Sequence, residues 1–166
     1  MTVRNWQVVP ALNPFRTRLA SLSDLPAICA IEDNSFHAPY PQSLLKRLLE
    51  DCSQSFFVAL DNEGSLVGYC VISLSPDSAH LISIAVHSRL RRKGVATLLL
   101  QRTVEYLSSH NVDELRLEVG VNNMEALSLY GKLGFEKMGL LKAYYSDGSD
   151  AVSMRLFSRA ATSKLP

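Results

Sequence analysis

Residues 80–97, HLISIAVHSRLRRKGVAT, constrain the fold more than any other stretch of the chain. The apolar run at 81–86 is too short for a core helix and has the length of a buried strand. After Gly94, apolar residues recur at helical spacing. Between the two lies a turn with four basic side chains: Arg89, Arg91, Arg92 and Lys93. The pattern predicts a strand, a basic turn and the first turn of a helix.

This turn is suited to binding an anion. The first N–H groups of a helix lack intrahelical partners, and the helix dipole adds partial positive charge there. Gly94 leaves room for a ligand to approach the backbone, and Ala96 keeps the next turn small. Each cation at this end opposes the dipole by about 0.3–1 kcal/mol, a cost that a bound anion would relieve. Two interpretations follow, a phosphate site and a surface helix with a basic first turn. Neither GxxxxGK[ST] nor GxGxxG is present.

Composition narrows the function classes. A chain of 166 residues with a net charge of +1 is typical of one soluble domain and lacks the basic surface that nonspecific nucleic-acid binding needs. Cys29, Cys52 and Cys70 have no CxxC spacing, so we expect neither a disulfide framework nor a metal site. No signal-peptide pattern and no apolar stretch of membrane-spanning length occur. We therefore expect a cytoplasmic protein with reduced thiols and no membrane association.

The order of predicted elements is β-α-α-β-β-β-α-β-α-β-β, which implies an α/β sheet of mixed direction. The predicted strands are 15–20, 55–60, 66–74, 81–86, 114–121, 135–141 and 151–157. The predicted helices are 23–36, 42–51, 95–110 and 123–132. Residues 1–14 are predicted to be an N-terminal extension, 15–158 one domain and 159–166 a C-terminal tail.

Several short motifs follow one another between Arg91 and Met154. The first is Arg91-x-x-Gly94-x-Ala96, directly after the strand that ends at Val86. The other motif residues are Leu117-Glu118-Val119, Asn123, Ala126, Leu129-Tyr130, Leu133-Gly134-Phe135, Tyr144-Tyr145, Asp147-Gly148-x-Asp150-Ala151 and Met154. The series resembles the GNAT acetyltransferases, and among them the RimI-type and archaeal Ard-type N-terminal acetyltransferases.

The resemblance implies the GNAT acyltransferase fold, a mixed and mostly antiparallel sheet splayed around an acetyl-CoA site with flanking helices. It implies transfer of the acetyl group of acetyl-CoA to the N-terminal α-amine of a protein or peptide, with possible ribosome or auxiliary-subunit association and no direct contact with nucleic acid. Two alternatives stay open. One is a GNAT enzyme that acetylates lysine side chains or a small amine, and the other is a non-catalytic acyl-CoA-binding subunit.

The same resemblance assigns the cofactor contacts. The backbone of three strand residues would pair with the pantetheine arm in the manner of an added strand: Ile84, Ala85 and Val86. The turn and first helical residues would hold the pyrophosphate: Arg91, Arg92, Lys93, Gly94, Val95, Ala96 and Thr97. Asn123 and Tyr130 would flank the thiol end of the cofactor.

The resemblance also assigns acid–base roles. Glu118 matches the general base, acting through water, and Tyr130 matches the general acid that protonates the leaving thiolate. His80 matches a residue that orders the catalytic water. The alternatives are an exposed strand carboxylate, a core tyrosine and a histidine that caps a strand end. An α-amine is roughly 14% neutral at pH 7 and a lysine about 0.04%, so one modest base favours termini.

Substrate contacts are assigned to two loops. Phe36, Pro39 and Tyr40 would wall the first side chain of the substrate, and Tyr144 and Tyr145 would grip its backbone; the alternative for each is an aromatic that fills a loop. Two departures concern substrate choice: Gly120 stands where RimI-type proteins often have arginine, and residues 36–41 contain no acidic residue where some Ard-type proteins place one. His37, His87 and His110 are expected to be surface or capping residues.

Overall fold

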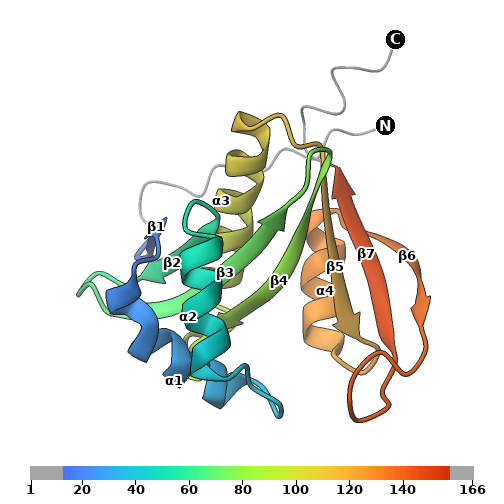
Figure 1. Ribbon diagram of the computed structural model, residues 1–166, viewed down its shortest axis with the longest axis horizontal. Helices are drawn as coiled ribbons and strands as arrows, with labels where there is room; N and C mark the ends of the chain where they lie inside the picture. Colours follow the sequence, from blue (N-terminus) through green and yellow to red (C-terminus); the bar gives the residue numbers. More distant parts are fainter. Residues whose placement is uncertain (1–12, 158–166) are drawn as a thin grey trace. The chain divides into compact units, whose positions relative to one another are not determined.

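The computed structural model describes residues 13–157 (Figure 1). Within this range the strands are β1 (Arg16–Leu19), β2 (Phe56–Leu60), β3 (Leu66–Leu74), β4 (Ser78–Val86), β5 (Glu114–Gly120), β6 (Glu136–Leu141) and β7 (Ala151–Phe157). The helices are α1 (Leu25–Ser35), α2 (Gln42–Asp51), α3 (Val95–Ser109) and α4 (Met124–Leu133), with 3-10 turns η1 (Leu22–Asp24) and η2 (Ser88–Leu90). The predicted order of strands and α-helices is confirmed.

Hydrogen bonds join the described strands in one seven-stranded sheet of order β1-β2-β3-β4-β5-β7-β6. The β4–β5 pair is parallel, whereas β1–β2, β2–β3, β5–β7 and β6–β7 are antiparallel. The predicted sheet, mixed and mostly antiparallel, is therefore confirmed. The predicted extension at 1–14 and tail at 159–166 lie outside the described residues, apart from Asn13 and Pro14. The domain boundaries stay a prediction.

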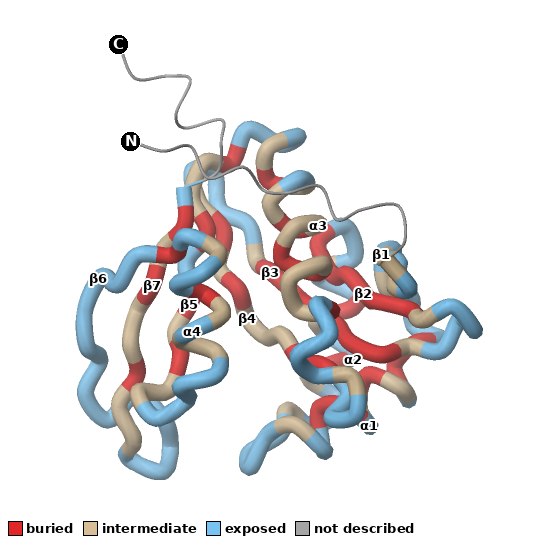
Figure 2. Tube along the Cα trace, turned by 180° about the vertical axis from the view of Figure 1, so that it is seen from behind, coloured by how far each residue is buried: buried red, intermediate tan, exposed pale blue. Residues whose placement is uncertain are grey.

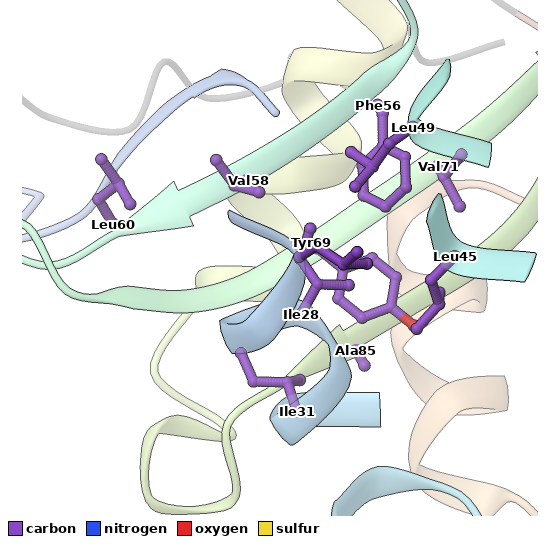
Figure 3. Close-up of a cluster of buried hydrophobic side chains, with 11 residues drawn as sticks. Ile28, Ile31, Leu45, Leu49, Phe56, Val58, Leu60, Tyr69, Val71 and Ala85 are labelled. Carbon is purple, nitrogen blue, oxygen red and sulfur yellow. The ribbon is translucent and has the colours of Figure 1, made fainter. Parts of the chain in front are cut away.

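The described chain forms two compact units, residues 13–73 with 82–106 and residues 74–81 with 107–157. The core of the first unit lies where α1 and α2 pack on β2 and β3 (Figure 3). All five residues of β2 are buried (Figure 2). Leu25, Ile28 and Ile31 form the apolar stripe of α1 and are buried in this core. Such burial supplies most of a helix's stability in a folded protein.

Gly68 on β3 brings α3 close to the sheet in the first unit. A Cβ at this position would lie 3.0 Å from the Ala85 carbonyl oxygen and 3.1 Å from the Val95 side chain. Only a glycine leaves room for this approach, because Cβ contacts this short are strongly repulsive. The close packing fixes the first turn of α3 against the end of β4, and these are the two ends of the predicted anion-binding segment.

In the second unit, β5 lies between the start of β4 and β7. His80 is in register with Arg116 on the parallel pair. The short helix α4 begins after Asn123 and ends at Gly134, whose φ of 97° is left-handed. Glycine adopts this conformation without steric cost, and Gly134 therefore terminates the helix. All six residues of β6 are exposed (Figure 2).

Some predicted boundaries were wrong by a few residues. β4 begins at Ser78 rather than at residue 81, because a turn closed by the Ser75 N–H and the Ser78 carbonyl (2.8 Å) starts the strand early. The first helix divides into η1 and α1. Ser21 caps η1, and the Asp24 carboxylate accepts from the Ser21 N–H at 2.8 Å. α2 and β3 have the predicted bounds.

Candidate functional site

The predicted anion-binding segment ends in an open turn. Residues 91–94 form the turn, with left-handed φ values of 61° at Arg92 and 87° at Gly94. Among the described residues, no atom other than those of Gly94 and its two chain neighbours lies within 4 Å of the place that a Cβ on Gly94 would occupy. The first hydrogen bond of α3 joins the Leu98 N–H to the Gly94 carbonyl at 2.9 Å. The N–H groups of the three preceding residues, 95–97, therefore start the helix and point along its axis, which fits a phosphate group.

The basic side chains of this turn differ in their contacts. The Arg91 guanidinium donates to the Val86 carbonyl at 3.3 Å and to the Ser35 hydroxyl at 3.4 Å. It thereby ties the turn to the ends of β4 and α1. Arg92 and Lys93 are exposed. Arg91 thus braces the turn, and the predicted cofactor contacts of Arg91, Arg92 and Lys93 stay predictions.

In the second unit the structure brings together His80, Glu118 and Tyr144. His80 Nε2 lies 2.5 Å from Glu118 Oε2, and the Tyr144 hydroxyl donates to the same oxygen at 3.4 Å. The strands position the pair, because Glu118 lies two residues beyond Arg116, the register partner of His80, and so on the same face of β5. The side chain of His80 is 45% exposed and that of Glu118 is 18% exposed. The cluster can therefore exchange protons with solvent or substrate.

Asn123 and Tyr130 have structural contacts in the same unit. The side-chain oxygen of Asn123 accepts from the Ala126 N–H at 3.1 Å and caps α4. Tyr130 is 6% exposed, and its ring centroid lies 5.3 Å from that of Phe135. The burial of Tyr130 fits the alternative of a core tyrosine as well as a buried acid. The cofactor contacts of both residues and the acid role of Tyr130 stay predictions.

Phe36, Tyr144 and Tyr145 in the two predicted substrate loops are exposed, whereas Tyr40 is not. Phe36 is 40% exposed, and Tyr40 is partly buried, which raises the pKa of its phenol together with the nearby charge of Glu32. Tyr144 and Tyr145 pack edge to face with ring centroids 5.1 Å apart. A Cβ on Gly120 would contact the Tyr145 ring at 3.8 Å, so a large side chain there would crowd this hairpin.

The histidines outside the cluster are surface or capping residues, as predicted. His37 and His110 are exposed, and His110 Nδ1 lies 3.0 Å from the Ser109 hydroxyl. His87 Nδ1 accepts from the Arg89 N–H at 3.3 Å and caps η2.

Sequence reasoning missed Glu32, which is 2% exposed on α1. Its carboxylate accepts from the Tyr40 N–H at 2.8 Å and from the Tyr69 hydroxyl. Burial first, and the bond to Glu32 second, raise the pKa of Tyr69. The available signal was position: Glu32 stands seven residues after Leu25 and continues the apolar stripe of Leu25 and Ile28.

Within residues 13–157, no helix combines the length and the apolar character needed to cross a membrane. Within the same range, no group of three or more His, Cys, Asp or Glu side chains is arranged to hold a metal ion.

The chain resembles known proteins over most of its length. Residues 25–135 match the model of the acetyltransferase (GNAT) family. An N-alpha-acetyltransferase of Sulfolobus acidocaldarius is 37% identical over 153 residues, covering 84% of this chain and 90% of the relative. The Ard1 structure from Thermoplasma volcanium has a TM-score of 0.83 at 33% identity, covering 87% of this chain and 97% of that one. The structure of the ribosomal-protein-S18-alanine N-acetyltransferase from Escherichia coli has a TM-score of 0.80 at 27% identity, covering 92% of this chain and 99% of that one.

Proposed function

The chain belongs to the acetyltransferase (GNAT) family, and from that premise we propose that it acetylates the N-terminal α-amine of proteins. It is an enzyme that uses acetyl-CoA as acetyl donor. The N-terminal target is supported by relatives named N-alpha-acetyltransferase that are 34–37% identical over most of the chain. The observation within the structure that carries the proposal is the contact of Glu118 with both His80 and Tyr144.

In the proposed reaction, the neutral α-amine attacks the carbonyl carbon of the thioester. A C–N bond forms and the C–S bond breaks. The proton released by the amine nitrogen passes through a water molecule to Glu118, and His80 orders this water. The departing thiolate receives a proton from the Tyr130 phenol, so that the products are an acetylated terminus and free CoA.

The proposed contacts with the pyrophosphate and the pantetheine arm lie in the first unit. The N–H groups of Val95, Ala96 and Thr97, with the exposed charges of Arg92 and Lys93, would hold the pyrophosphate. The open space at Gly94 allows a phosphate to approach the backbone. Arg91 would act indirectly by keeping the turn in place, and the backbone of 84–86 would pair with the pantetheine arm.

Partners and location form part of the same proposal. The substrate would be the N-terminus of a protein or peptide, presented with or without a ribosome or an auxiliary subunit. The proposed location is the cytoplasm. Sedimentation of tagged protein with ribosomes at low and high salt, and cell fractionation, test these two statements separately.

The test of the proposed function is a peptide-library assay with the purified protein. The first two positions are varied, and release of free thiol from acetyl-CoA is followed. We expect acetylation of free termini and none of peptides whose α-amine is blocked. Acetylation of a blocked peptide through a free lysine would instead favour the side-chain alternative. Binding of acetyl-CoA without thiol release for any peptide would favour the non-catalytic alternative.

A further inference from the structure

Glu32 stands in the last turn of α1. Its main-chain carbonyl accepts from the Phe36 N–H at 3.1 Å, as that of any helical residue here would. Its side-chain Oε1 accepts from the Tyr40 N–H at 2.8 Å. Pro39 and Pro41 carry no N–H, so the Tyr40 amide is the backbone donor in this proline-flanked part of the loop. The Glu32 side chain thus ties the second half of the loop to the end of α1.

The second oxygen of Glu32 is bound inside the core. The Tyr69 hydroxyl donates to Oε2, and the Tyr69 oxygen also lies 2.9 Å from the Ser83 hydroxyl on β4. Tyr69 is fully buried, and Figure 3 shows its ring among Ile28, Leu45 and Ala85. The network therefore connects the loop, through one carboxylate and one phenol, to the middle of a rigid strand.

Burial of this carboxylate needs an explanation beyond packing. An ionised group in the core is costly unless its lone pairs are bonded. An apolar residue would complete the stripe of α1 without that cost. Satisfied buried networks of this kind instead select one conformation among several. What Glu32 adds over an apolar residue is a fixed position for the Tyr40 backbone.

We propose that Glu32 is a specificity-determining positioning residue. By fixing residues 36–41, it would hold Phe36, Pro39 and Tyr40 as one wall against the first side chain of the substrate. This inference rests on the proposed function, because the wall has meaning only if a peptide N-terminus binds beside it.

The experiment compares Glu32→Leu and Glu32→Gln with wild type and with Asp24→Leu. Leucine fits the apolar stripe but accepts no hydrogen bond, whereas glutamine keeps an acceptor for the Tyr40 N–H. Asp24 is the matched control, a second buried carboxylate of the first unit that accepts from a backbone N–H, that of Ser21. Two quantities are measured: the ratio of kcat/KM for peptides with small and large first residues, and the exchange rate of the Tyr40 amide proton by NMR.

We expect Glu32→Leu to reduce the ratio of kcat/KM for small over large first residues by about tenfold, through peptide KM and with acetyl-CoA KM unchanged. The same variant should speed exchange of the Tyr40 amide proton at least about tenfold. Glu32→Gln should keep both the kcat/KM ratio and the Tyr40 exchange rate close to wild type, and Asp24→Leu should change neither quantity. An equal loss of kcat/KM for all peptides overturns the inference, as does unchanged exchange at Tyr40. If wild type acetylates no peptide, the proposed function fails; the exchange data then decide alone whether Glu32 fixes the loop.

Discussion

Glu32 in the first unit and Glu118 in the second are carboxylates with opposite surroundings. Glu32 is 2% exposed, and its side-chain oxygens are bound by a backbone N–H and a core phenol. The Glu118 side chain is 18% exposed, and its oxygen contacts a histidine and a tyrosine that are themselves 45% and 47% exposed. A carboxylate locked in the core can fix the chain, whereas one beside exposed titratable groups can exchange protons.

The largest expected effect comes from Glu118→Gln. The amide keeps the shape of the side chain but cannot accept a proton, so kcat/KM should fall about 10²–10⁴-fold, the usual value of general acid–base catalysis. Stability should change by no more than about 1 kcal/mol, because the His80 partner is half exposed. Steady-state thiol release and urea unfolding measure the two quantities.

Glu114→Gln is the matched control for this variant. Glu114 lies on the same strand, its side chain is 14% exposed, and it contacts Arg116 at 2.6 Å. Its replacement removes an ion pair of β5 without touching His80 or Tyr144. We expect activity within about twofold of wild type, since no acid–base step is altered. If Glu114→Gln lost as much activity as Glu118→Gln, or if both variants kept full activity, the acid–base role of Glu118 would be contradicted.

Asp24 is a buried structural carboxylate like Glu32. Hydrogen bonds from the Arg18 guanidinium, at 2.7 and 2.8 Å, hold the pKa of Asp24 below its ordinary value. The folded pKa then lies below the unfolded value of about 3.9, so the ionised form stabilises the fold above that pH and the gain is lost as pH falls through the folded pKa.

Asp24→Asn should therefore lower the free energy of unfolding by about 1–2 kcal/mol at pH 7, since Arg18 is half exposed and screened by solvent. The difference from wild type should shrink below about pH 4. Urea unfolding at pH 7, 5 and 3 measures it, and kcat/KM at pH 7 should be unchanged. A difference independent of pH would remove ionisation as the cause, and a large loss of activity would place Asp24 with Glu118.

The two carboxylates also show what could be predicted from sequence. Periodicity predicted the bounds of α2 and β3, because local patterns of 3.6 and 2 residues determine them. His80 and Glu118 followed from a resemblance carried by local motifs on β4 and β5. Glu32 could not be found in this way, since its partner Tyr69 stands 37 residues away in sequence. The pattern indicated only a charge on an apolar stripe.

Arg91 in the basic turn is a similar case. Its charge and position predicted a contact with phosphate, which stays a prediction, but not the bonds of its side chain to the Val86 carbonyl and the Ser35 hydroxyl. The contact with Ser35 spans 56 residues and depends on where α1 ends. Local sequence indicates which residues are charged. Which of them also brace the turn is decided by tertiary contacts.

Tyr144→Phe has the smallest expected effect, and it tests whether a neighbouring hydroxyl acts on the Glu118 carboxylate. The bond from Tyr144 to Glu118 is long at 3.4 Å and the residue is 47% exposed, so its loss should lower kcat/KM by only about twofold to fivefold. If the hydroxyl acts on Glu118, the loss lies in kcat, whereas a residue that only grips the peptide changes KM. Tyr145→Phe, in the same hairpin, is the control and should alter KM alone. Equal KM effects in both variants would show that Tyr144 only grips the peptide, leaving His80 to set the environment of Glu118.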